Sequence, residues 1–177
     1  MSLRDPLADP APLIQKVYAY IAYRIGDGPD AEDLTGEVFE RAVKYRSSYD
    51  PARGGSLSWL IGIARRCVDG RRMTPAPVDS FDVEQAASVD FEGGALERLT
   101  VARAISVLDA RSRELVALRY GADLTARQIG ALLDLKPNTV EVSLHRALAR
   151  VRSELEAQDK AFGTEVAVRG PAPRTSP

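Results

Sequence analysis

Residues 125–155 read TARQIGALLDLKPNTVEVSLHRALARVRSEL, and the fold follows most directly from this stretch. Thr125 is a good helix N-cap, and Gln128, three residues later, completes the sequence signature of a capping box. Pro137 suits the first turn of a second helix, because its φ is fixed and it has no N–H to leave unpaired. The stretch therefore predicts two helices separated by a short break.

The second of these helices is amphipathic and basic. One face carries an apolar stripe made of Val140, Leu144, Leu148, Val151 and Leu155. Three arginines lie away from that stripe, at positions 146, 150 and 152. Two helices joined by a few residues, the second one basic, have the geometry that inserts a helix into a DNA major groove. An antiparallel helical hairpin without a role in DNA binding is the alternative interpretation.

Apolar residues recur at helical spacing in the rest of the chain, and no run of alternating β-branched residues appears, so the expected fold class is all-α. The segment 74–94 contains two prolines, a Gly-Gly pair and acidic residues without a base. These features predict two small helical domains, at 10–73 and 95–157, joined by a flexible acidic linker. The last residues, 158–177, are expected to form a disordered tail.

Composition excludes several classes of protein. The chain of 177 residues has one cysteine, Cys67, and one histidine, His145, which excludes an internal disulfide and a cysteine-based zinc cluster. No nucleophile has a partner base, so we expect no enzyme, no cofactor, no metal and no small-molecule substrate. The N-terminus lacks the layout of a signal peptide, and no apolar run approaches the roughly 20 residues of a membrane span. We expect a cytoplasmic protein without a membrane partner.

The net charge of −1 hides a strong segregation of sign. Residues 44–73 carry seven bases and two acids, and residues 136–152 carry four bases and one acid. Two basic patches, one in each expected domain, suit a polyanion that is bound at two separate places. Two ordinary solvated helix faces are the alternative.

The N-terminal half contains two further features. DAEDLTGEVFERAV, at 30–43, predicts an acidic helix that could dock on a basic protein surface or simply face solvent. Arg53-Gly54-Gly55 predicts a basic loop, followed by a helix that starts near Ser56 and carries Trp59. Cationic side chains next to an aromatic ring suit single-stranded DNA, although core packing is the other role open to the tryptophan.

Both halves resemble one family. The N-terminal pattern is DAEDL..EVF.RA followed by YDP.RG...SWL..IAR, and the C-terminal pattern is VLDARSRELVALRYGADLTARQIGALLDLKPNTVEVSLHRALARVR. In this order and spacing they resemble bacterial sigma factors of the extracytoplasmic-function (ECF) type, in the primary-sigma superfamily. The resemblance covers residues 10–73 and 96–155.

The resemblance implies a function and a set of site residues. The first domain would bind core RNA polymerase and open the −10 promoter element, and the second would read the −35 element by its helix-turn-helix. The polymerase-binding residues would be Asp33, Leu34, Glu37 and Phe39. The −10 element would be contacted by Arg53, Ser56, Trp59, Arg65 and Arg66. The −35 element would be contacted by Lys136, Pro137, Thr139, Glu141, Ser143, Arg146 and Arg150. The implied partners are core RNA polymerase, promoter DNA and an anti-sigma factor.

Some positions depart from the family pattern. Gly36 stands where the family has a glutamine, Asp134 replaces the usual glycine of the turn, and Glu141 and Ser143 stand where basic residues are common. A carboxylate in the groove repels phosphate but accepts a hydrogen bond from cytosine N4, so binding by the second domain alone is expected to be weak. The alternatives are a sigma-like adaptor and a helix-turn-helix regulator, both without promoter-initiation activity.

Overall fold

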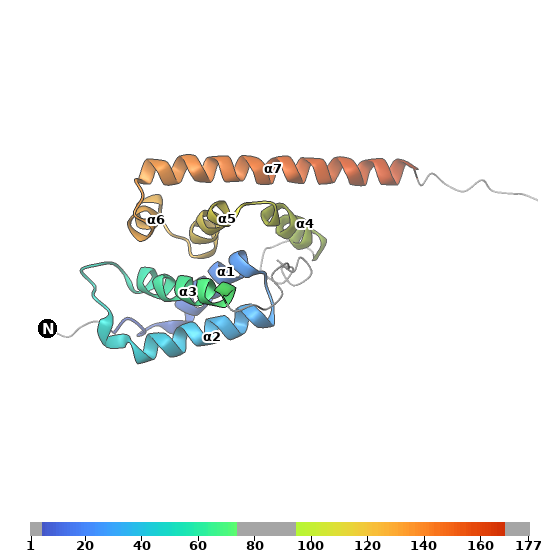
Figure 1. Ribbon diagram of the computed structural model, residues 1–177. Coiled ribbons are helices and arrows are strands. Elements are labelled where there is room, and N and C mark those ends of the chain that lie inside the picture. Colours follow the sequence, from blue (N-terminus) through green and yellow to red (C-terminus); the bar gives the residue numbers. More distant parts are fainter. Residues whose placement is uncertain (1–4, 74–94, 169–177) are drawn as a thin grey trace, which may run out of the picture.

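The computed structural model describes residues 5–73 and 95–168, which are helical with short connections and contain no strand. The all-α prediction is therefore confirmed for these residues (Figure 1). The predicted linker at 74–94 and the last part of the predicted tail, 169–177, lie outside the described residues.

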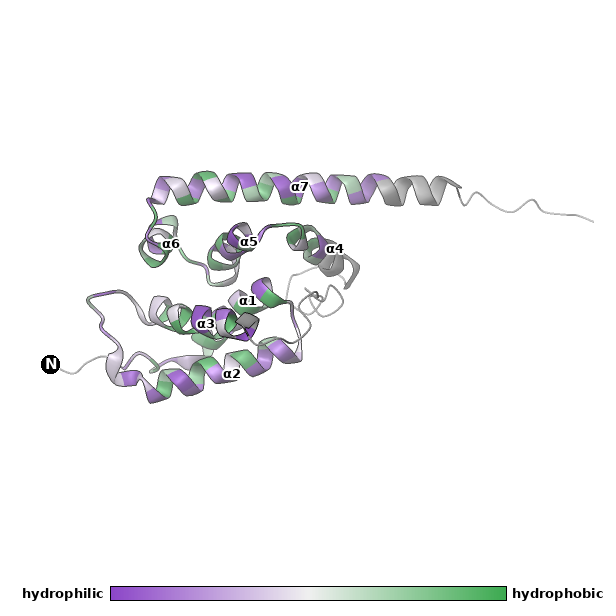
Figure 2. Cartoon of the chain, in the orientation of Figure 1, coloured by the Kyte–Doolittle hydropathy of each residue, from purple (hydrophilic) through white to green (hydrophobic). Residues whose placement is uncertain are grey.

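The first module contains three α-helices and one 3₁₀ turn. Their bounds are α1 Pro10–Ile25, α2 Pro29–Lys44, η1 Arg46–Ser48 and α3 Ser56–Met73. Proline occupies the first position of both α1 and α2, where its missing N–H costs nothing. Each helix buries one apolar stripe. In α2 this stripe is Leu34, Val38 and Ala42, which recur at helical spacing in the sequence and face inward. Figure 2 shows hydrophilic and hydrophobic residues alternating along these helices, as expected for amphipathic helices that each bury one face.

The second module contains four α-helices and a π-helical turn. Their bounds are α4 Ala95–Ser106, α5 Ala110–Val116, η3 Ala117–Gly121, α6 Ala126–Leu133 and α7 Pro137–Val168. The long helix α7 lies across α4, α5 and α6 and contacts all three (Figure 1). Val140, Leu144 and Ala147 of α7 are buried, whereas Leu148 is 37% exposed. The inward stripe therefore includes the alanine rather than the leucine.

The helix-turn-helix forms as the sequence predicts. Thr125 and Gln128 make a complete capping box at the start of α6. Asp134 adopts the left-handed conformation, with φ 54° and ψ 48°, at the position where the family has glycine. A Cβ on Gly130 would lie 2.5 Å from the carbonyl oxygen of Leu135, so only glycine allows the chain to turn back this closely.

The tail prediction is wrong over residues 158–168. Helix α7 continues to Val168 instead of ending near 157. The Gln158 side chain donates a hydrogen bond from Nε2 to Oε1 of Glu154, one turn earlier, at 3.1 Å. Good helix formers and the absence of proline between positions 138 and 170 let the helix continue past residue 157.

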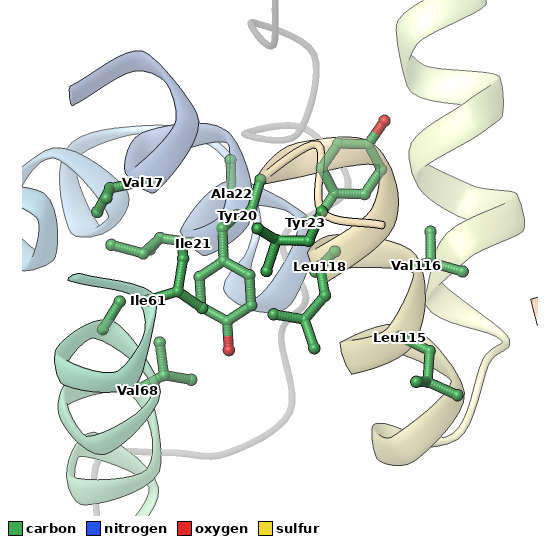
Figure 3. Packing of buried hydrophobic residues seen from close by; sticks show 14 of the residues in the cluster. Val17, Tyr20, Ile21, Ala22, Tyr23, Ile61, Val68, Leu115, Val116 and Leu118 are labelled. Carbon is green, nitrogen blue, oxygen red and sulfur yellow. The ribbon is translucent and has the colours of Figure 1, made fainter. Parts of the chain in front are cut away.

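The two modules share one hydrophobic core instead of standing apart. Helix α1 packs against η3 of the second module, and the buried cluster runs without a break from one module into the other. Figure 3 shows Tyr20 and Tyr23 of α1 beside Leu118 of the second module. Burial raises the pKa of the Tyr23 hydroxyl to about 12, which keeps it neutral at physiological pH.

Candidate nucleic-acid interface

A hollow of about 800 Å³ lies beside the loop between η1 and the first turns of α3. Its lining from the first module includes the loop Asp50–Gly55 in part, together with Trp59, Ile63 and Arg66. The ring of Trp59 is supported by Tyr49, with ring centroids 5.5 Å apart and planes inclined at 58°. This tilted arrangement holds the tryptophan in one orientation at the edge of the hollow.

The loop beside the hollow is fixed by local hydrogen bonds. Asp50 accepts a hydrogen bond at Oδ1 from the backbone N–H of Ala52 at 2.9 Å, which is an Asx turn. Gly54 has φ 149°, a backbone conformation that side-chain-bearing residues rarely adopt. These constraints place Arg53, which is exposed, on the same rim as the exposed Arg66. An aromatic ring and two cations around one hollow can stack a base and hold its phosphates.

The second candidate surface is the N-terminal half of α7. Val140 and Leu144 anchor this half in the core, so the opposite face is presented to solvent. Ser143 is half-buried, and the exposed residues of the predicted reading face are Lys136, Pro137, Thr139, Glu141, Arg146 and Arg150. A solvent-facing helix of this kind, supported by α6 across a tight turn, can enter a major groove without a change of its own conformation.

Both modules match known family models. Residues 12–74 match the family described as "Sigma-70 region 2", and residues 98–151 match "Sigma-70, region 4". The chain belongs to the ECF sigma factors.

Relatives agree with this assignment, and two solved structures share the fold. The ECF RNA polymerase sigma factor SigK of Mycobacterium ulcerans is 27% identical over 151 residues, which span 80% of this chain and 81% of the relative. SigL of Mycobacterium tuberculosis is 26% identical over 146 residues, spanning 79% and 82%. Among solved structures, the sigma factor RpoE in complex with the anti-sigma factor NepR, from Bartonella quintana, superimposes with a TM-score of 0.63 at 18% identity, covering 81% of this chain and 92% of that one. CnrH in complex with the cytosolic domain of CnrY superimposes with a TM-score of 0.57 at 24% identity, covering 83% and 82%.

The sigma factor brings together three of the five predicted −10 residues. Arg53, Trp59 and Arg66 line the hollow. Ser56 opens α3 and is half-buried. Arg65 points elsewhere: its Nε lies 2.7 Å from Oε1 of Glu114 in the second module. Its charge is therefore engaged within the protein in this structure.

The predicted polymerase-binding residues divide between the surface and the interior. Asp33 is exposed on α2, and Glu37 is half-exposed and paired with Arg41 one turn later. Phe39 is partly buried against the core. Leu34 is only 3% exposed, so it anchors α2 from the inside and offers no surface to a partner. The period of the apolar residues in α2 already placed it on the inward face.

One predicted −35 residue is engaged at the second surface. Nη1 of Arg150 lies 3.3 Å from Oδ2 of Asp109, the N-cap of α5. Hydrogen bonds from Ser112, and then the charge of Arg150, hold the pKa of the Asp109 carboxyl below its usual value. The carboxylate is therefore ionised at neutral pH and competes with DNA phosphate for this arginine.

Sequence reasoning missed two residues of these surfaces. Tyr49 lies just before the basic loop in the sequence and packs against Trp59, and an aromatic residue at the edge of that loop was the available signal. Glu114 gave no sign, because its partners lie 49 and 90 positions away in the chain.

Cys67 is buried, and burial raises the pKa of its thiol, which suits an inert core residue. In the described parts of the chain, no helix is both long and apolar enough to cross a membrane.

Proposed function

We propose that this sigma factor binds core RNA polymerase and directs promoter-specific transcription initiation by holding the −10 and −35 elements on its two modules. The hollow around Trp59, with Arg53 and Arg66 on its rim, is the observation that carries the proposal. It combines stacking and phosphate binding in the module whose sequence matches sigma region 2.

At the −10 element, the hollow favours an unpaired strand over a duplex. Extruding a base costs a few kcal/mol, which stacking on Trp59 and phosphate contacts from the two arginines offset. A protein that binds the melted strand more tightly than the duplex shifts the opening equilibrium by that difference in affinity. In this proposal Arg65 joins the site once its ion pair with Glu114 of the second module is released, and Ser56 joins the site as well.

At the −35 element, α7 enters the major groove with Lys136, Pro137 and Thr139 leading. Glu141 accepts a hydrogen bond from cytosine N4, and Ser143 adds a short polar contact. Arg146 and Arg150 bind phosphate, the latter after exchanging its pairing with Asp109 for the DNA backbone. Binding by this surface alone should be weak, because an acidic side chain faces the groove and one cation is already paired.

Polymerase binding is assigned to the outer edge of α2. Asp33 and Glu37 supply negative charge there, Phe39 supplies apolar contact area, and Leu34 keeps the helix in place. The family resemblance assigns the clamp helices of the largest polymerase subunit as the docking surface, and we expect cationic side chains there opposite Asp33 and Glu37. Charge complementarity of this kind speeds encounter and fixes orientation.

Further assignments follow from the family. The two solved relatives are in complex with an anti-sigma factor and with the cytosolic domain of CnrY, and we assign an anti-sigma partner to this chain as well. Transcription initiation factors act by binding, so the chain is not itself an enzyme and needs no cofactor. We place it in the cytoplasm, with residues 10–73 and 95–157 as its two functional domains and 74–94 as the acidic connection that passes toward the polymerase cleft.

Transcription by purified core polymerase tests the proposal. With the full-length chain added, transcripts should start at a small set of sites that share −10 and −35 sequences. Trp59→Ala should abolish these transcripts while polymerase binding persists, and Trp59→Phe, which retains a stacking ring, should restore them in part. Polymerase binding without any specific transcript would favour the adaptor. Binding of duplex DNA by a dimer, without polymerase, would favour the helix-turn-helix regulator.

A further inference from the structure

The line of side chains on α7 that points furthest from the protein carries no charge. The opposite, inward side of the helix is made of three residues that are at most 7% exposed, Val140, Leu144 and Ala147. With 3.6 residues per turn, the side chains opposite to them belong to three exposed residues, Asn138, Val142 and Ala149. This outer line is therefore made of an amide, a valine and a methyl group.

Val142 is the large apolar side chain on the outer line. It is 42% exposed and is not one of the side chains that pack against the core. Arg146 and Arg150 lie beside it, displaced around the helix by about 40° and 80° towards one flank. The valine thus stands at the crest of the helix, and these two cations stand on its side.

This order of side chains suits a helix in the major groove. The crest of such a helix faces the floor of the groove, where the base edges lie, and its flanks face the phosphate backbones. Residues near the N-terminus of a recognition helix contact the base edges, and Val142 lies in the second turn of α7. Arg146 and Arg150 on the flank then meet phosphate, and Val142 meets a base.

The chemistry of the groove selects the base that a valine can contact. Among the groups on the major-groove edges, the C5 methyl of thymine is apolar, whereas the amino, carbonyl and ring nitrogen groups form hydrogen bonds. The methyl groups of Val142 cannot form hydrogen bonds. Placed against an amino group of adenine or cytosine, they would displace its water and leave the donor unpaired, which is unfavourable. Placed against a thymine methyl, they bury apolar surface on both sides.

We propose that Val142 determines part of the promoter specificity by contacting the methyl group of one thymine in the −35 element. The inference rests on the proposed function and names a base that the second module recognises. It adds to the readout a residue that the family resemblance did not supply, because the set assigned by resemblance omits the crest of the helix.

Replacing thymine by deoxyuridine tests this contact, because the two bases pair alike and differ by the methyl group alone. The full-length chain first enriches duplexes, at low salt, from a pool with about twelve randomised base pairs, slightly more than one helical turn. Each thymine of the enriched duplex is then replaced in turn, and fluorescence anisotropy measures the affinity. At one thymine the replacement should weaken binding about fourfold, the size expected for one buried methyl group.

Three variants assign the effect to the valine. Val142→Ala should bind the thymine and deoxyuridine duplexes equally, whereas Val142→Ile should keep the difference. Both changes fall on an exposed position, so neither alters the core. Asn138→Ala, on the same outer line, is the matched control: it should lower both affinities alike and keep their ratio at about fourfold.

The inference is overturned if no replacement weakens binding by the wild type, if Val142→Ala keeps the fourfold difference, or if Asn138→Ala abolishes it as well. An enriched common sequence without sensitivity to the methyl group would preserve the −35 assignment and remove the valine contact alone. A pool from which no common sequence is enriched would contradict the −35 assignment and the thymine contact with it.

Discussion

The two candidate DNA surfaces differ in how available they are. The reading face of α7 is open to solvent along its N-terminal half, with one of its cations, Arg150, paired to Asp109 at the surface. The hollow around Trp59 is shared: one wall comes from α6, and Arg65 is bound to Glu114 of the second module. Counting positive charges makes the two surfaces look alike, whereas the structure shows that one is preformed and the other is partly occupied by the protein itself.

The largest effect is expected from the core that the modules share. Leu118→Ala removes a fully buried side chain in η3 and should lower the free energy of unfolding by about 2–5 kcal/mol. Trp59, the single tryptophan, lies in the first module and reports on it by fluorescence. Because the core is continuous, the unfolding midpoint measured by tryptophan fluorescence should fall by the same amount as the midpoint measured by circular dichroism. An unchanged fluorescence midpoint would show that the modules unfold independently, and Leu148→Ala, at a 37% exposed position, is the control.

Removing the aromatic ring distinguishes the two DNA surfaces. Trp59→Ala should weaken single-strand binding by about 1–3 kcal/mol, roughly five- to 150-fold, because a stacked base loses its platform. Binding of a duplex −35 site should be unaffected. Anisotropy titrations with the two DNA forms measure both, and an equal loss on both forms would mean that the variant disturbs the fold rather than the hollow.

A phosphate contact on α7 should have a smaller and more uniform effect. Arg150→Ala should weaken duplex binding similarly for all sequences and reduce the slope of log K against log salt by about 1, since one fewer counterion is released. Arg103→Ala, an exposed position on α4, is the comparison. If the salt slope equals the wild-type value in both variants, Arg150 does not contact a DNA phosphate.

The smallest effect concerns the cap that holds Arg150. The pKa of Asp109 is lowered in the folded protein, so its contribution to stability is present above the usual aspartate pKa of about 3.9 and is lost as pH falls through the lowered value. Asp109→Asn keeps a capping side chain without a titrating charge. Between pH 5 and 2 the wild type should therefore lose a few tenths of a kcal/mol more than the variant, a small difference because solvent screens this exposed pair. Parallel urea denaturation series measure it, and identical pH dependence would argue against a charged cap.

Local signals in the sequence predicted most of the fold. The capping box at Thr125, the start of α7 at Pro137 and the inward face of α2 all depend on residues within a few positions of one another. The same short-range patterns placed Arg53, Trp59 and Arg66 around one site, because they sit on one loop and the helix that follows it.

Contacts between distant parts of the chain were beyond such reasoning. The pairing of Glu114 with Arg24 and the approach of Gly121 to Tyr20 depend on how two amphipathic modules dock, and neither residue stands out in its own segment. Leu34 was assigned to a partner by resemblance although its periodicity placed it in the core. The continuation of α7 was missed because a nearby glycine and a proline-rich end outweighed the good helix formers after Leu155.

Mapping of transcription start sites tests the central claim most directly. Core polymerase, fragmented genomic DNA and the full-length chain are combined, and the 5′ ends of the transcripts are sequenced. The account predicts a small set of new starts, absent without the chain, that share one sequence near −10 and another near −35. Starts identical with and without the chain would contradict it.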